Sequence, residues 1–147
     1  MILPTGDTNR ETWDTYTSAW KLGTAEEKLS VLALSTDQAC IYRDPLAHTC
    51  GHEELVGYML DFHQQMPGGH FETTHFQSHH GRSIARWNMR DGNGAIVGDG
   101  ISYGEYNDTG KLIGMTGFFC HTSSAVDAQP TRGYRWTTLP GCREEST

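Results

Sequence analysis

The segment AIVGDGISYGEYNDTGKLIGMTGFFCH, residues 95–121, decides the fold. Two runs rich in β-branched and aromatic residues, 95–106 and 111–121, flank the turn at 107–110, Asn-Asp-Thr-Gly. Asn and Gly accept the positive φ that tight hairpins need, so this pattern predicts two antiparallel strands. Residues 70–78 and 83–90 predict two earlier strands. The second half of the domain is therefore predicted to be a meander of four strands.

Three helices are predicted before the meander. Residues 8–11 and 24–27 each have the form of a capping box, in which a Thr hydroxyl and a Glu carboxylate satisfy the first free backbone amides. The first helix should extend to Gly23 and carry an aromatic stripe on one face. A third helix is predicted from Gly51 to the break at Pro67.

A strand is predicted between the second and third helices, over residues 38–43. Proline lacks the amide that a strand ladder needs, so this strand must end at Asp44, before Pro45. The order of elements predicts an α+β fold in which the three helices lie on the concave face of a curved antiparallel sheet. The convex face of that sheet then needs cover, and we expect a second copy of the chain there, forming a homodimer.

The length and net charge of the chain limit the number of domains and the kinds of partner that it can bind. A chain of 147 residues suits one core, predicted over residues 1–122 and followed by an irregular tail, 123–147, that docks in part through Tyr134 and Trp136. The net charge of −7 opposes binding to nucleic acid or to an anionic membrane. No long apolar stretch or export signal is present, so we expect a cytoplasmic protein.

The order of these elements, with Asp44-Pro45 closing the first strand and DTGKLIGMTGFF at residues 108–119, resembles the nuclear transport factor 2-like superfamily. It is most similar to the SnoaL-like and ketosteroid isomerase-like branches. The resemblance covers residues 7–121 and implies a cone with a deep pocket between sheet and helices. It specifies the activity poorly, because the superfamily includes isomerases, cyclases, hydrolases, dehydratases and binding domains.

The resemblance also implies catalytic residues. Tyr16 matches the tyrosine that donates to the oxyanion in ketosteroid isomerases, and Asp44 matches their general base. Ser102 stands where those enzymes have a second acid, which argues against a ketosteroid isomerase itself. His121 is an alternative acid or base near the rim. A purely structural role stays open for each: Asp44 in a turn, Tyr16 in the core and His121 at a strand end.

The remaining predicted pocket residues are apolar or small. Gly98, Gly100, Ser102 and Gly104 alternate on one face of a strand, which indicates either that a bulky group approaches this face, in part Trp87 and in part a ligand, or that the glycines relieve curvature of the sheet. A two-residue hairpin at Gly92-Asn93 would place Trp87 opposite Gly98. The predicted substrate-binding residues are Trp13, Trp20, Tyr42, Phe62, Trp87, Ser102, Met115 and Phe119.

No cofactor or metal is expected. Eight histidines are present, but no carboxylate or thiolate joins them at a recognisable spacing. The leading hypothesis is a cofactor-free enzyme that isomerises, cyclises or dehydrates a hydrophobic, carbonyl-bearing substrate by proton transfer. The alternative is a non-catalytic binding or dimerisation module of the same fold.

Overall fold

The computed structural model describes residues 8–119, which form three helices and six strands. In chain order these are α1 (Thr8–Ser18), α2 (Ala25–Ser35), β1 (Thr36–Asp44), β2 (Ala47–Cys50), α3 (Gly51–Gln65), β3 (His70–His79), β4 (Arg82–Arg90), β5 (Ile96–Tyr106) and β6 (Leu112–Phe118). The α+β fold, the four-strand meander and the three helices are confirmed. The predicted tail, 123–147, and His121 lie outside the described residues.

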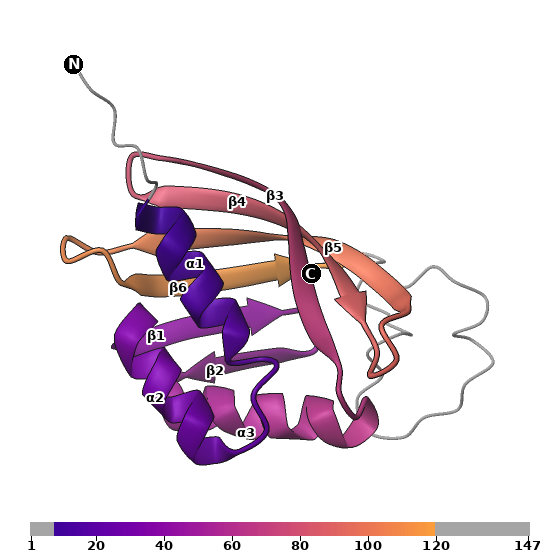
Figure 1. The fold of residues 1–147 in the computed structure, drawn as a ribbon. Coiled ribbons are helices and arrows are strands. Elements are labelled where there is room, and N and C mark those ends of the chain that lie inside the picture. Colours follow the sequence, from indigo (N-terminus) through magenta and orange to yellow (C-terminus); the bar gives the residue numbers. More distant parts are fainter. Residues whose placement is uncertain (1–7, 120–147) are drawn as a thin grey trace.

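The six strands form one curved sheet in the order β2-β1-β6-β5-β4-β3, and the helices lie on its concave face (Figure 1). Every neighbouring pair is antiparallel except β1 and β6, which run parallel. The sheet is therefore mixed, not purely antiparallel as predicted. Long chain segments separate β1 from β6, so nothing local in the sequence marks this parallel pairing.

The short strand β2 was not predicted. It pairs antiparallel with the end of β1, from Ile41 opposite Cys50 to Asp44 opposite Ala47. The segment Ala47–Cys50 is short and follows a proline, so its alternation of apolar and polar residues is too weak for it to be recognised as a strand. Because β2 turns the chain back beside β1, it sets where α3 begins, at Gly51.

Helix α1 ends at Ser18, not at Gly23. Ala19 and Trp20 follow in a tight turn, in which their amides donate to the carbonyls of Tyr16 and Thr17 at 3.0 Å. The aromatic stripe therefore continues past the helix, and Trp20 is carried by the turn. None of the helices between residues 8 and 119 combines the length and apolar character needed to cross a bilayer.

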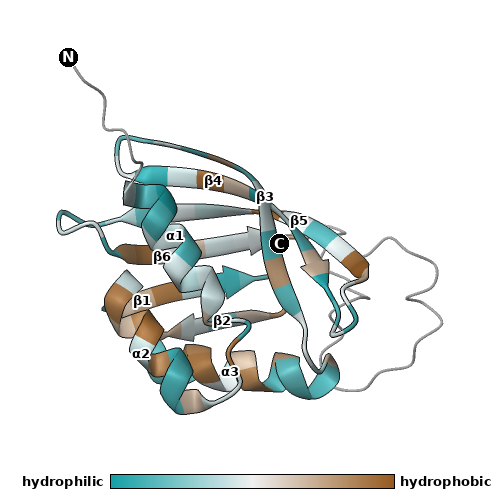
Figure 2. Cartoon of the chain, in the orientation of Figure 1, coloured by the Kyte–Doolittle hydropathy of each residue, from teal (hydrophilic) through white to brown (hydrophobic). Residues whose placement is uncertain are grey.

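The core lies between the helices and the concave face of the sheet. Figure 2 shows apolar bands on α2 and α3, whereas α1 is mainly hydrophilic in colour. The buried side chains of α1 are the aromatic residues Trp13 and Tyr16, which combine a large apolar ring with one polar atom. Helix α1 can thus contribute both apolar rings and polar atoms to a pocket, whereas α2 and α3 contribute mainly apolar side chains to the core.

The β4–β5 hairpin has a longer loop than predicted. Asp91 closes it, with its amide donating to the Ala95 carbonyl and its carboxylate accepting from the amides of Asn93 and Ala95. As a result Trp87 lies opposite Gly100, and the predicted pairing of Trp87 with Gly98 is wrong. This shift of two residues keeps Trp87 on the same face of the sheet.

Candidate active site

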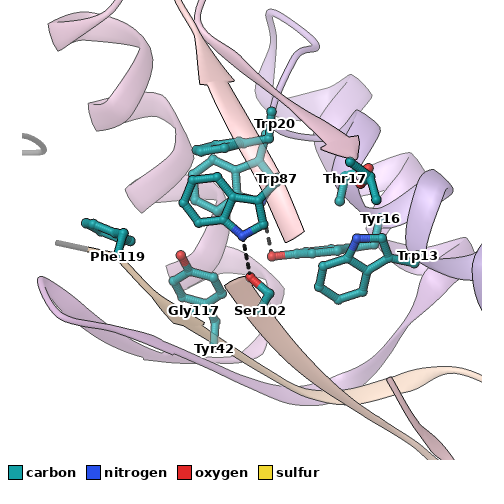
Figure 3. A pocket seen from close by; sticks show the side chains of 11 residues that line it. Trp13, Tyr16, Thr17, Trp20, Tyr42, Trp87, Ser102, Gly117 and Phe119 are labelled. Carbon is teal, nitrogen blue, oxygen red and sulfur yellow. Dashed lines mark hydrogen bonds between the residues drawn. The ribbon is translucent and has the colours of Figure 1, made fainter. Parts of the chain in front are cut away.

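A pocket opens between α1 and the concave face of the sheet (Figure 3). The empty space inside it, counted out into the open solvent at its mouth, is about 440 Å³. It is lined by Trp13, Tyr16, Thr17, Trp20, Tyr42, Phe71, Thr73, Trp87, Ser102, Gly117 and Phe119. The lining combines many aromatic rings with a few hydroxyl groups, and the described residues bring no carboxylate into it.

Aromatic rings form one continuous wall of the pocket. The ring of Trp20 lies 5.6 Å from that of Tyr42 and 5.3 Å from that of Phe71. Phe71 then meets Trp87 edge to face at 5.0 Å, and Trp87 lies 6.0 Å from Phe119. These are the separations at which aromatic pairs attract each other. The wall is therefore ordered by its own contacts and offers flat apolar surfaces to a ligand.

The glycines of β5 make room for protein side chains. A Cβ on Gly100 would lie 2.5 Å from Trp87 Cζ2, and one on Gly104 would lie 3.3 Å from Trp13 Cζ3. A Cβ on Gly98 would meet Met89 at 3.1 Å. The close approach of bulky groups therefore explains the alternating glycines. These groups are the side chains of Trp87, Trp13 and Met89.

Ser102 holds the indole of Trp87 in place. Trp87 Nε1 donates to Ser102 Oγ at 2.9 Å, as the dashed line in Figure 3 shows. A hydroxyl that accepts one hydrogen bond still has its own hydrogen to donate. Ser102 donates it to no other described residue, so this hydrogen is available to a ligand in the pocket.

Tyr16 presents a second donor. Its hydroxyl accepts from Trp20 Nε1 at 3.1 Å and faces the pocket beside Ser102 (Figure 3). Burial raises the pKa of the Tyr16 phenol far above its ordinary value of 10.0. The phenol therefore stays protonated at any physiological pH. Because the Trp20 indole donates to the phenol oxygen, the hydrogen of the phenol must point away from that indole.

Asp44 lies behind the pocket wall and accepts from four donors. Tyr42 Oη donates to Asp44 Oδ2 at 2.6 Å, and Tyr58 Oη donates to the same carboxylate at 2.9 Å. The amides of Leu46 and Ala47 donate to Oδ1 at 2.8 and 2.9 Å. Burial raises the pKa of Asp44, and these hydrogen bonds oppose that rise in part.

Tyr42 connects Asp44 to the pocket. The phenol ring of Tyr42 lines the pocket while its hydroxyl contacts the carboxylate. Burial, with the charge of Asp44 adding to it, raises the pKa of Tyr42 well above 10.0. Tyr42 is thus a protonated phenol whose hydrogen is already directed at a carboxylate.

Gly117 leaves an opening where three polar residues meet. A Cβ at this position would lie 3.5 Å from Ser102 Oγ, 3.7 Å from Asp44 Cβ and 3.9 Å from Tyr42 Oη. These contacts are ordinary, so a methyl group would fit at Gly117 without strain. Gly117 therefore lies beside the hydroxyls of both Ser102 and Tyr42 in the lining of the pocket.

The structure brings most of the predicted pocket residues together. The predicted residues that line the pocket are Trp13, Tyr16, Trp20, Tyr42, Trp87, Ser102 and Phe119. Phe62 and Met115 are buried but lie behind the wall, where Phe62 stacks on Phe71 at 5.3 Å. Asp44 reaches the pocket only through Tyr42, and its carboxylate also closes the turn after β1 by accepting from the amides of Leu46 and Ala47.

Four lining residues were not selected from the sequence: Thr17, Phe71, Thr73 and Gly117. Thr17 follows Trp13 by one helical turn, which is a usable signal. Phe71 and Thr73 alternate on β3, but a bulge between Thr73 and His75 hides which face of the strand is inward. Gly117 has no side chain to recognise.

Metal ligands do not gather in the described part of the chain. No three His, Cys, Asp or Glu side chains of residues 8–119 are grouped as a metal site requires. His75, His79 and His80 are exposed, and His79 and His80 contact each other through their Nδ1 atoms at 3.1 Å.

Comparison with solved structures identifies the architecture. A SnoaL-like family protein from Agrobacterium tumefaciens, which carries the name of an isomerase, matches with a TM-score of 0.71 and 21% identity over 77% of this chain and 98% of that one. The chain has the nuclear transport factor 2-like fold. No protein-family model and no curated protein matches the sequence.

Two further solved structures are similar to the chain over most of its length. A SnoaL-like protein from a Jannaschia species, named as a polyketide cyclase, gives a TM-score of 0.64 at 13% identity, covering 81% of this chain and 90% of that one. TerC, crystallised with polyporic acid, gives a TM-score of 0.63 at 12% identity over 77% and 92% of the two chains. The resemblance seen in the sequence is thus confirmed at the level of the fold.

Proposed function

We propose that the pocket binds a flat, hydrophobic, carbonyl-bearing small molecule and catalyses cofactor-free proton transfer on it. The reaction would be an isomerisation, cyclisation or dehydration. The proposal rests on the polar groups of an aromatic pocket. The hydroxyls of Tyr16 and Ser102 each have a hydrogen to donate, and the hydroxyl of Tyr42 donates to the buried carboxylate of Asp44. The names of structural relatives, an isomerase and polyketide cyclases, support the same general kind of chemistry.

The two free hydroxyl hydrogens suit a carbonyl oxygen. When a proton leaves the carbon next to a carbonyl, negative charge develops on the oxygen, and fixed donors stabilise it. Tyr16 and Ser102 are each fixed by an indole N–H that occupies the hydroxyl oxygen as acceptor. Their hydrogens are therefore directed before a ligand arrives, which lowers the cost of reorganisation during the reaction.

The carboxylate of Asp44 is the base in this proposal, and Tyr42 is the group that meets the substrate. The C–H bond of the substrate breaks, its proton passes to Tyr42 Oη, and the Tyr42 proton passes to Asp44 Oδ2. The electron pair stays on the substrate as an enolate held by Tyr16 and Ser102. Burial favours this step because it raises the pKa of Asp44 toward that of a more effective base.

Exchange of the C1 protons of 2-tetralone in D₂O tests the proposal without knowledge of the natural substrate. We expect the protein to accelerate this exchange, as followed by proton NMR. Tyr16→Phe removes the donor and Asp44→Asn removes the base, and each should slow the catalysed exchange by about 100-fold.

Asp37→Asn is the matched control. Asp37 also lies in β1 and also accepts a nearby amide, from Ala39 at 2.8 Å, but it does not line this pocket. Exchange by this variant should equal that of the wild type. Undiminished exchange in Asp44→Asn would refute the assignment of the base.

A binding module without catalysis is the second candidate, and one observation favours it. Both oxygens of Asp44 already accept hydrogen bonds, from two phenols and two amides. A carboxylate satisfied in this way can serve to order the wall of a binding pocket. Binding of 2-naphthol by calorimetry, combined with no acceleration of 2-tetralone exchange, would select this alternative.

A further inference from the structure

Trp13 carries a buried hydrogen-bond donor that no described residue satisfies. Its side chain is 2% exposed and lines the pocket, yet Nε1 has no acceptor within residues 8–119. The other two described tryptophans differ, because Trp20 Nε1 donates to Tyr16 and Trp87 Nε1 donates to Ser102. A buried N–H without an acceptor destabilises the folded protein, so an acceptor supplied by a ligand would be favoured there.

The position of this donor is set by the packing of the ring. Cζ3 of Trp13 approaches Gly104, at 3.3 Å from where a Cβ would stand. Nε1 belongs to the five-membered ring, across the indole from Cζ3, so the edge of the ring that packs on Gly104 is not the edge that carries the donor. Figure 3 shows Trp13 at the opposite end of the pocket from Phe119, with Tyr16 and Ser102 between them.

The strand register shows which positions of β5 the two polar regions lie beside. Gly104 pairs with Met115, and Ser102 pairs with Gly117. The Trp13 ring therefore packs on the β5 position that lies one same-face step from Ser102, and these two strand positions are on the order of 7 Å apart.

Hydroxyl groups accompany the Trp13 donor. Thr17 and Thr73 both line the pocket. The Thr17 hydroxyl donates to the Asp14 carbonyl at 3.1 Å, and the Thr73 hydroxyl has no hydrogen bond within residues 8–119. Both hydroxyls belong to the lining of the pocket in which a ligand would meet Trp13.

We propose that the ligand of this pocket carries two oxygen acceptors at opposite ends of a flat apolar body, and that Trp13 Nε1 binds the second one. The first oxygen faces Tyr16 and Ser102, where the reaction is proposed to occur. This inference rests on the proposed function, since it assumes that the pocket binds such a molecule. Trp13 is thereby a specificity-determining residue, and the ligand is a dioxygenated aromatic or quinone-like compound.

Two matched probes test the inference by calorimetry: 2-naphthol, with one oxygen, and 2,6-dihydroxynaphthalene, with one at each end. The wild type should bind the diol about 3- to 10-fold more tightly, the range expected for one added neutral hydrogen bond. In Trp13→Phe, which keeps an aromatic ring and loses the N–H, this preference should vanish. In Trp87→Phe both affinities can change, but the preference for the diol should persist, because Trp87 Nε1 donates to Ser102.

Proton–nitrogen NMR of the indole groups gives a direct readout of the same contact. The Trp13 Nε1–H resonance, assigned by its loss in Trp13→Phe, should move downfield when the diol binds and stay in place when 2-naphthol binds. Thermal unfolding of each variant checks that it folds.

The outcomes separate the two proposals. Binding of both probes with equal affinity by the wild type, or a diol preference that survives in Trp13→Phe, would overturn this inference alone and leave the exchange chemistry intact. Failure of the folded wild type to bind either probe would overturn both proposals.

Discussion

Two glycines on neighbouring strands, Gly100 and Gly117, differ in what a methyl group would meet. At Gly100 a Cβ would lie 2.5 Å from both the Phe118 carbonyl oxygen and the Trp87 ring, closer than atoms can pack. At Gly117 the nearest atom would be Ser102 Oγ at 3.5 Å, an ordinary contact. Gly100 is therefore required by the packing of Trp87, whereas Gly117 keeps a space that the fold itself does not need.

Gly117→Ala should separate binding from stability. The added methyl group fits, so the thermal midpoint should stay within about 2 °C of the wild type. It occupies the space between Ser102 and Tyr42, so the affinity for 2-naphthol should fall by roughly 10-fold, as measured by calorimetry. Gly114→Ala, on the same strand, is the control, because its Cβ would meet only the flexible Glu105 side chain, at 3.2 Å. Unchanged affinity in Gly117→Ala would place the ligand elsewhere.

At the scale of elements, a buried lysine ties the helices around the turn that carries Trp20. Lys28 of α2 is 0% exposed, and its Nζ donates to the carbonyls of Ala19 at 2.8 Å and Leu22 at 2.7 Å. Nζ also lies 3.3 Å from Nδ1 of His63 in α3, and His63 Nε2 donates to the Trp20 carbonyl. One cation thus satisfies the carbonyls that remain after α1 ends, and it holds one wall of the pocket.

The cost of burying this cation should appear as a dependence of stability on pH. Burial lowers the pKa of Lys28 from its ordinary value of 10.5 to about 8. Between these values the unfolded chain holds a proton that the folded chain has released, so the free energy of unfolding should rise with pH. The rise attributable to Lys28 should total at most about 3 kcal/mol.

Urea unfolding at several pH values between 8 and 10.5 measures this dependence. The stability of the wild type relative to Lys28→Met should increase across that window. The exposed Lys21 provides the matched control, since Lys21→Met should follow the wild type. Parallel curves for the wild type and Lys28→Met would show that the buried amine keeps its ordinary pKa.

At the scale of the whole molecule, the outer face of the sheet remains to be explained. Side chains on this face include Ile84, Ile101, Tyr103 and Phe118, which neighbour one another across β4, β5 and β6. Phe118 is 60% exposed and Ile84 is 40% exposed. Monomeric proteins rarely leave a contiguous apolar patch of this kind uncovered, which is the basis for expecting a second copy.

Homodimerisation through this face is the expected outcome. Arg86 and Asp99 lie on the same face, so a two-fold related copy can bring opposite charges together at the edge of the apolar patch. Sedimentation velocity should show a dimer at micromolar concentration, and Phe118→Glu should shift it to monomer. Leu34→Glu, at an exposed position of α2, should leave the dimer intact. A wild-type monomer at 100-fold higher concentration, on the order of 10⁻⁴ M, would contradict the prediction.

Local chemistry allowed much of the fold to be predicted from the sequence. The capping box at Thr24 and Glu27 forms as expected, with both reciprocal hydrogen bonds. The turn at 107–110 places Gly110 at a φ of +86°, and Asn107 accepts from the amides of Thr109 and Lys111. Asp44 ends its strand and binds amides two and three residues on. Each of these features is decided by residues close together in the chain, so a local pattern suffices.

The tertiary structure alone decided the features that join distant segments. These include the parallel pairing of β1 with β6, the placement of Trp87 over Gly100, and the interposition of Tyr42 between Asp44 and the pocket. The sequence by itself determined the elements, the aromatic character of the pocket and most of its lining. Which polar atoms face a ligand depends on packing between segments far apart in the chain, and no local pattern encodes that. Trp13 illustrates the difference, because its apolar ring was predictable and its unpaired N–H was not.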